Sequence, residues 1–131
     1  VTPHLRELEY LSGVPLAQIS ADPRQSAAML ASRYPYLCVV AKDDLTWIMQ
    51  GERQSVNIIG NDGLAKGGSG DVLCGIIAGL YAQGRQAYES ACAGVYLHAL
   101  SACMLAEGCD TMSILPHELS ECLGKACAKL R

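Results

Sequence analysis

The sequence predicts an α/β protein in which short strands and a hairpin precede a glycine-rich loop and a group of apolar helices. Three observations support this class. A continuous apolar run over residues 36–41 is typical of a strand that is buried on both faces. Two more apolar runs, separated by charged turn residues, predict a hairpin. Five glycines within residues 60–70 then lead into a long apolar segment, which we expect to be a helix.

The other elements follow from start and stop signals. Thr2 is expected to cap a first helix that ends at Gly13, and Asp22 begins a second helix that runs to about Arg33. Strands are expected at residues 36–41, 45–49 and 55–59, and later helices at residues 71–83, 86–106 and 116–130. Gly75 and Gly79 lie one turn apart in the third helix, so we expect another element to approach closely there.

Composition limits the classes of function. A chain of 131 residues fits one domain or part of one. A hydrophobic content of 50% with 18% charged residues is enough to form a packed core. The net charge of −3, without basic runs among aromatic residues, argues against nucleic acid as a partner. No apolar stretch approaches the roughly 20 residues that span a bilayer, so no membrane is expected.

The seven cysteines indicate a reducing compartment. Their number is odd, no CxxC pair occurs, and most lie in apolar segments, as free thiols do in the cytoplasm. A zinc site could be assembled only from His98, Cys103, Cys109 and His117, whose spacings match no common zinc pattern. We therefore predict a cytoplasmic protein with no protein-built metal site.

The glycine loop predicts a phosphate site at residues 67–71. Glycines allow successive backbone N–H groups to converge on one anion, and the helix that follows adds the partial positive charge of its N-terminus. Asp71 is expected as the first helical residue. The residues alone leave two roles open for it, because a carboxylate there can cap the helix or accept a proton from an attacking hydroxyl. Neither GxxxxGK[ST] nor GxGxxG is present.

Residues 61–80 resemble the signature of the ADP/ATP-dependent NAD(P)H-hydrate dehydratases, N-x-G-M-A-T-G-G-S-G-D-V-L-x-G-I-I-A-G-L. Residues 2–7, 39–42, 95–98 and 114–116 are similar to further motifs of that family, in the same order. The resemblance implies a ribokinase-like three-layer fold. It also implies that residues 1–131 are the carboxy-terminal portion of a single domain, completed by an amino-terminal segment or another chain, in a protein that is a homo-oligomer.

The resemblance implies an activity as well. The family repairs hydrated NADH and NADPH: ADP or ATP, with Mg²⁺, phosphorylates the added ring hydroxyl, and loss of phosphate restores the ring. Asp71 would be the catalytic residue and would contact the substrate together with His4 and Glu7. The nucleotide-binding residues carried over are Lys42, Asp43, Asp44, Leu45, Thr46, Asn61, Asp62, Gly63, Leu64, Ala65, Lys66, Gly67, Gly68, Ser69 and Gly70.

Some positions depart from the family pattern. Lys66 stands in place of Thr, Asp43 in place of Gly, and Cys103 in place of an acid. Lys66 has two open interpretations, a phosphate contact or a solvated side chain, and His98 is expected to pack within its long helix. Two alternative functions also stay open: a kinase of the same superfamily for a vitamin precursor or sugar, and a non-catalytic module that binds nucleotide.

Overall fold

The computed structural model describes residues 1–130, which divide into two compact units. Unit 1 comprises Val1–Ile58 together with Ala87–Cys92, and unit 2 comprises Ile59–Gln86 together with residues 93–130. One helix, α5 (Ala87–Ala106), contributes its first turns to unit 1 and the rest to unit 2. Each unit is described below by itself.

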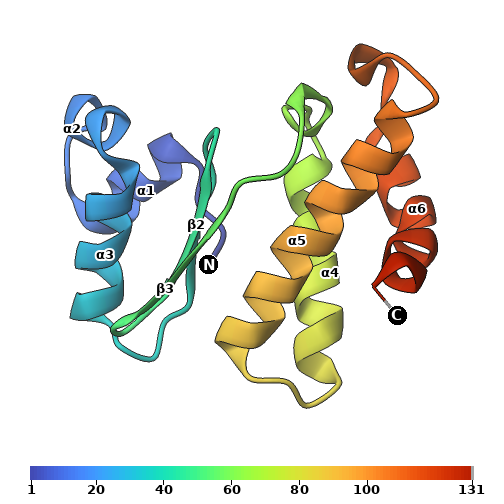
Figure 1. Ribbon diagram of the computed structural model, residues 1–131. Coiled ribbons are helices and arrows are strands. Elements are labelled where there is room, and N and C mark those ends of the chain that lie inside the picture. The colour runs from blue at the N-terminus through green and yellow to red at the C-terminus, as the bar shows by residue number, and fades with distance from the viewer. Residues whose placement is uncertain (131) are drawn as a thin grey trace. The chain divides into compact units, whose positions relative to one another are not determined.

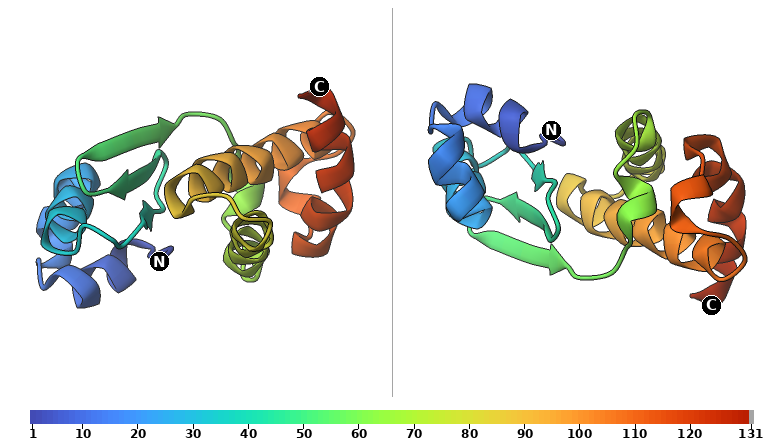
Figure 2. Two further views of the ribbon diagram at one scale, coloured as in Figure 1. Left: turned by 90° about the horizontal axis from the view of Figure 1, so that it is seen from below. Right: turned by 90° about the horizontal axis from the view of Figure 1, so that it is seen from above.

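Unit 1 is a small antiparallel sheet with helices on one face (Figures 1 and 2). The sheet has the order β1-β2-β3. In its register Val40 lies opposite Ile48, and Ile48 lies opposite Ser55. The elements are α1 (Leu5–Ser12), α2 (Leu16–Ala21), α3 (Pro23–Arg33), β1 (Val39–Ala41), β2 (Thr46–Gln50) and β3 (Arg53–Asn57).

The first helix begins at a different residue from the one predicted. His4, not Thr2, is the N-cap of α1, and residues 1–3 are extended along β1. The Val40 amide donates to the Val1 carbonyl, and the Lys42 amide donates to the Pro3 carbonyl, each at 2.9 Å. Buried strand N–H groups need acceptors, and the extended segment supplies them on the side of β1 away from β2.

The strand predicted at residues 36–41 is too long by three residues. Pro35 lies in a turn that the Leu37 amide closes on the Tyr34 carbonyl, and Tyr36 is 97% exposed. The three residues of β1 are buried, as predicted for a strand covered on both faces. Val39 and Ala41 join Leu8, Ile19 and Leu30 in the core between the sheet and the helices.

The first turn of α5 is attached to β3. The Tyr88 hydroxyl and Ser55 Oγ are 2.6 Å apart, and the Arg53 guanidinium lies 4.1 Å from the centroid of the Tyr88 ring. Glu89 adds an ion pair to Arg53 at 3.7 Å. Burial raises the pKa of Tyr88 above its usual value.

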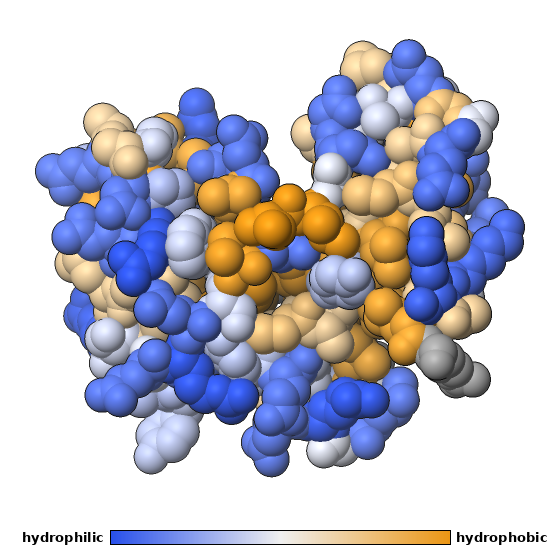
Figure 3. Space-filling view, in the orientation of Figure 1, coloured by the Kyte–Doolittle hydropathy of each residue, from blue (hydrophilic) through white to orange (hydrophobic). Residues whose placement is uncertain are grey.

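Unit 2 is helical. Its elements are η1 (Asp62–Leu64), α4 (Ser69–Ala82), the later turns of α5, η2 (Thr111–Ser113) and α6 (Pro116–Lys129). Ala102, Ile114 and Leu119 form its core, with Leu64 and Val72 packed against them. Tyr81, Tyr96 and Met112 are exposed in this unit. Figure 3 shows that hydrophobic residues reach the surface of the molecule. No helix within residues 1–130 is long and apolar enough to cross a membrane.

The close approach predicted at Gly75 and Gly79 occurs at another glycine. A Cβ added at either position meets no atom within 4 Å among residues 1–130, and both residues are exposed. A Cβ added at Gly94 of α5 would lie 2.6 Å from Ile77 Cγ1 of α4. The helix predictions are otherwise confirmed for α3, α5 and α6, while the short helix α2 was not predicted.

Candidate functional site

The glycine loop turns into α4 at Gly68, two residues earlier than predicted. Gly68 is the N-cap, with φ of +93°, and the helix begins at Ser69. The Ser69 amide donates to the Lys66 carbonyl and the Asp71 amide to the Gly68 carbonyl, each at 3.1 Å. Within residues 1–130 the amide N–H groups of Gly67, Gly68 and Gly70 have no protein acceptor. Three donors therefore remain for an anion at the N-terminus of α4.

Asp71 is the third residue of α4, not the first, and it does not cap the helix. No side chain makes a capping hydrogen bond at this end of α4. Asp71 is exposed, and its carboxylate has no hydrogen bond or ion pair within residues 1–130. Of the two roles left open by the sequence, the cap is excluded by this geometry. The carboxylate stays available to a ligand beside the three free amides.

A buried polar pair lies beneath the loop. Ser69 Oγ is 3.2 Å from Nε2 of His98, and both residues are less than 10% exposed. His98 is buried in α5 as predicted, but its hydrogen bond to the glycine loop was not predicted. The two residues are 29 positions apart, and no local pattern links them.

Besides Ser69, two predicted nucleotide-binding residues, Asn61 and Lys66, have side chains that bind the protein itself. Asn61 Nδ2 donates to the Ala102 carbonyl at 2.9 Å, while its Oδ1 accepts the Gly63 amide at 3.0 Å. Lys66 Nζ donates to the carbonyls of Met112 and Ile114, the latter at 2.7 Å. Lys66 is therefore neither fully solvated nor free to extend away from the protein.

Three further predicted site residues, Asp62, Leu64 and Ala65, lie in and directly after η1 in unit 2, and the others lie in unit 1. His4 forms an isolated parallel bridge with Lys42, so the start of α1 and the turn after β1 are neighbours. His4 and Glu7 form a capping box: the Glu7 amide donates to His4 Nδ1 at 3.3 Å, and Glu7 Oε2 accepts the His4 amide at 2.8 Å. In the turn, Asp43, Asp44 and Leu45 are exposed, whereas Lys42 and Thr46 are half-buried.

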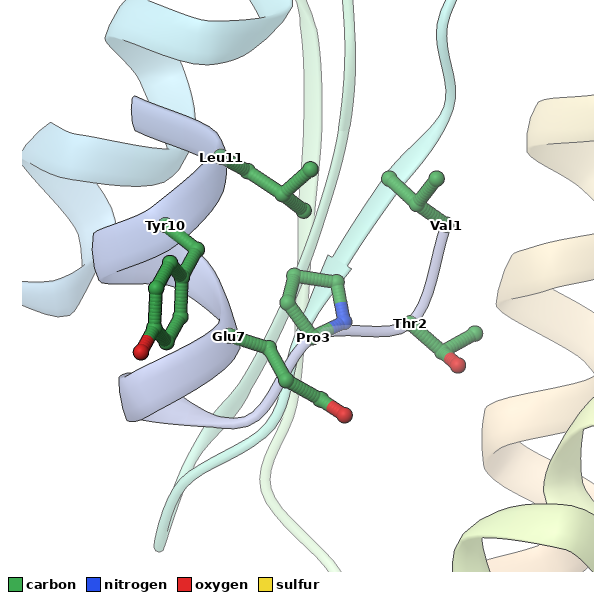
Figure 4. Close-up of a pocket in the computed structure, with 6 residues that line it drawn as sticks. All are labelled: Val1, Thr2, Pro3, Glu7, Tyr10 and Leu11. Atoms are coloured by element: carbon green, nitrogen blue, oxygen red, sulfur yellow. The ribbon is translucent and has the colours of Figure 1, made fainter. Parts of the chain in front are cut away.

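A pocket of about 380 Å³ lies between α1 and the extended residues 1–3. Figure 4 shows Glu7, Tyr10 and Leu11 of α1 on one side of it and residues 1–3 on the other. Pro3, Leu11 and Val1 make it largely apolar, and Glu7 contributes a carboxylate. This pocket holds one of the two predicted substrate-binding residues of unit 1, Glu7, while His4 lies beside it as the N-cap.

No metal-binding cluster of three or more His, Cys, Asp or Glu side chains occurs among residues 1–130. A nucleotide phosphate fits the donors at the start of α4 better than a bare cation does, since amide N–H groups attract anions. Mg²⁺ is commonly held by substrate phosphates and waters with one or two carboxylates, and Asp71 is the carboxylate next to those donors.

Residues 1–125 match the NAD(P)H-hydrate dehydratase family. The chain belongs to this family. An ADP-dependent (S)-NAD(P)H-hydrate dehydratase of Neisseria meningitidis is 40% identical over 108 residues, which are 82% of this chain and 36% of that protein. Membership in the NAD(P)H-hydrate dehydratase family thus rests on most of the chain, although the chain spans little more than a third of that relative.

Solved structures agree with this membership. The ADP/ATP-dependent NAD(P)H-hydrate dehydratase of Bacillus subtilis, co-crystallized with ATP and Mg²⁺, has a TM-score of 0.93 and 29% identity. The match covers 99% of this chain and 47% of that one. A ribokinase-like superfamily protein of Enterococcus faecalis has a TM-score of 0.84 and 33% identity over 98% of this chain and 43% of its own. The predicted ribokinase-like fold is confirmed.

Proposed function

We propose that the protein dehydrates hydrated NADH and NADPH at the expense of ADP or ATP. The observation that carries this proposal is the start of α4, where free amides of the glycine loop stand beside the exposed carboxylate of Asp71. The NAD(P)H-hydrate dehydratase family and the relatives named above support the choice of substrate. The chain spans 36% to 47% of those proteins, so the proposal concerns the whole protein.

The reaction divides into a phosphoryl transfer and an elimination. The oxygen of the added ring hydroxyl attacks the terminal phosphorus of the nucleotide, and Asp71 accepts the hydroxyl proton. The bond from this phosphorus to the rest of the nucleotide breaks, so ATP leaves as ADP and ADP leaves as AMP. The amides of Gly67, Gly68 and Gly70 hold the phosphoryl oxygens, and the helix N-terminus stabilises their negative charge. Phosphate then leaves the ring carbon with its electron pair, and loss of a ring proton restores the double bond.

Mg²⁺ supplies charge neutralisation between the phosphate oxygens when the nucleotide is bound. In this proposal it would enter with the nucleotide, and Asp71, in the first turn of α4, is a carboxylate that could approach it. The proposal assigns nucleotide-binding residues to the turn at residues 42–46 in unit 1 and to the loop at residues 61–70 in unit 2. His4 and Glu7, with the apolar pocket beside α1, form the substrate side.

We further propose that residues 1–131 form part of one ribokinase-like domain in a cytoplasmic homo-oligomer. The exposed apolar side chains of Tyr36, Tyr81 and Met112 support contacts with further protein, and seven free cysteines suit a reducing compartment. Light scattering of the whole protein measures its assembly. A monomer at micromolar concentration would contradict the oligomer.

The function is tested by offering the whole protein a panel of acceptors with ADP or ATP. We expect hydrated NADH and NADPH to be converted to the reduced dinucleotides, with equal release of phosphate. Phosphorylation of a vitamin precursor or sugar without dehydration would instead identify a small-molecule kinase. Nucleotide binding without any turnover would identify a non-catalytic module.

A further inference from the structure

We propose that Lys66 is a positioning residue that ties the glycine loop to the segment 110–116 and so sets the geometry of the phosphate-binding amides. This inference rests on the proposed function for its link to catalysis. The tether itself is a property of the protein without ligand and can be measured separately.

The loop needs an external restraint because its own residues restrain it little. A Cβ added at Gly67 meets nothing within 4 Å, and Gly68 has a φ that only glycine adopts readily. Glycines gain conformational entropy when a loop is released. The amides of Gly67, Gly68 and Gly70 can bind one anion tightly only if their directions are fixed before the anion arrives.

Lys66 supplies such a restraint directly before Gly67. Its half-buried side chain carries the ammonium to the carbonyls of Met112 and Ile114, 46 and 48 residues away in sequence. Hydrogen bonds from a charged donor are stronger than neutral ones. Two of the three ammonium protons are directed at these carbonyls. The ammonium is therefore already hydrogen-bonded to the protein before any phosphate binds.

Two more contacts join the same segments. A Cβ added at Gly63 would lie 2.9 Å from Ile114 Cδ1 and 3.1 Å from the Thr111 carbonyl, so this glycine is in close contact with the turn. On the other side of Lys66, a Cβ added at Gly68 would meet Pro116 Cγ at 3.4 Å. The loop therefore contacts residues 111–116 before, at and after Lys66, and the ammonium provides the polar contact among them.

The test is amide hydrogen exchange of the whole, ligand-free protein with Lys66→Met, followed by ADP titration. Met keeps the length and apolar stem of lysine but cannot donate to carbonyls. We expect exchange of the hydrogen-bonded amides around the tether to rise about tenfold, as loss of charged hydrogen bonds implies; these are the amides of Ser69, Asp71, Val72, Ser113 and Ile114. The affinity for ADP should fall by a similar factor, while the salt dependence of binding stays unchanged.

Two variants complete the design. Lys125→Met makes the same change in net charge at an exposed position of α6 and should leave exchange and affinity as they are. Lys66→Arg keeps charge and donors and should restore most of the protection, which separates a lost tether from a poorly folded loop. Exchange along α5 reports whether the fold is intact.

The proposal is overturned if Lys66→Met leaves exchange of the Ser69, Asp71 and Val72 amides unchanged. If ADP affinity and its salt dependence then both fall, Lys66 is a direct phosphate ligand. If neither changes, Lys66 has no role in the site. If the wild-type protein does not bind ADP at all, the proposed function is contradicted. Hydrogen exchange of the ligand-free protein still tests whether Lys66 restrains the glycine loop.

Discussion

Gly68 holds the backbone conformation that turns the glycine loop into α4. Its φ of +93° lies in the region that disfavours side chains, whereas Gly67 next to it has no positive φ and open space around it. Gly68→Ala should therefore lower the free energy of unfolding by about 1–2 kcal/mol, and Gly67→Ala should change it by less than about 0.5 kcal/mol. Urea denaturation measures both. Equal losses for the two variants would contradict the assignment of strain to Gly68.

The buried thiol of Cys38 should make the free energy of unfolding depend on pH in the alkaline range. Burial raises the pKa of the Cys38 thiol to about 11 from an ordinary value of 9.0, and Cys92 adds to the rise while the N-terminal amine opposes it. The folded state then keeps a proton that the unfolded chain loses above pH 9. The contribution to stability is complete below that pH and is lost as pH rises towards 11.

Cys38→Ala should therefore reduce the fall in stability across this range, as followed by urea midpoints at pH 8, 9 and 10. Cys74→Ala is the matched control, because Cys74 is exposed on α4 and should leave the pH dependence as it is. An identical fall in the wild type and in Cys38→Ala would show that this thiol does not contribute to it.

At the scale of elements, α4 and α5 are in close contact at Gly94. A Cβ there would lie 2.6 Å from Ile77 Cγ1 and 3.3 Å from the Ile77 backbone, so Gly94→Ala should destabilise by about 1–3 kcal/mol. Gly79→Ala should instead stabilise by about 1 kcal/mol, because an exposed helical glycine gains from alanine. Thermal melting of both variants checks this.

The sign of the Gly79→Ala effect also reports on neighbours of α4. The described residues leave the strip of Gly75 and Gly79 open. In a longer or oligomeric form of the protein that covers this strip, the added methyl group would destabilise. Comparing the 131-residue chain with the whole protein separates the two cases.

Local signals predicted the elements that begin with strong caps. Asp22 and Pro23 fixed α3, and Pro116 fixed α6, because capping chemistry lies within a few residues of the helix start. The predicted start of α1 was wrong, because residues 1–3 are held extended by β1, which is far away in sequence. Local propensity cannot include that pairing.

At the scale of the whole molecule, the glycine motif predicted the location of the candidate site but not its supports. The start of α4 after the glycine loop was predicted to within two residues, while phosphate binding at this turn and the catalytic role of Asp71 stay predictions. The bonds from His98 to Ser69, and from Lys66 to the turn before α6, join segments 29 to 48 residues apart. Such contacts depend on how α5 and α6 pack on the loop, and no single-sequence pattern records that packing.

The central claim is that Asp71 acts on a substrate hydroxyl beside a phosphate held by the glycine loop. The most direct test is the rate of dehydration of hydrated NADH with ADP or ATP by the whole protein and by Asp71→Asn. We predict turnover by the wild type, a loss of about 100-fold or more in the variant, and unchanged affinity for the nucleotide, because Asp71 makes no capping bond that the helix would lose. A variant that loses nucleotide binding and turnover in equal measure, or one that turns over as fast as the wild type, would contradict the account.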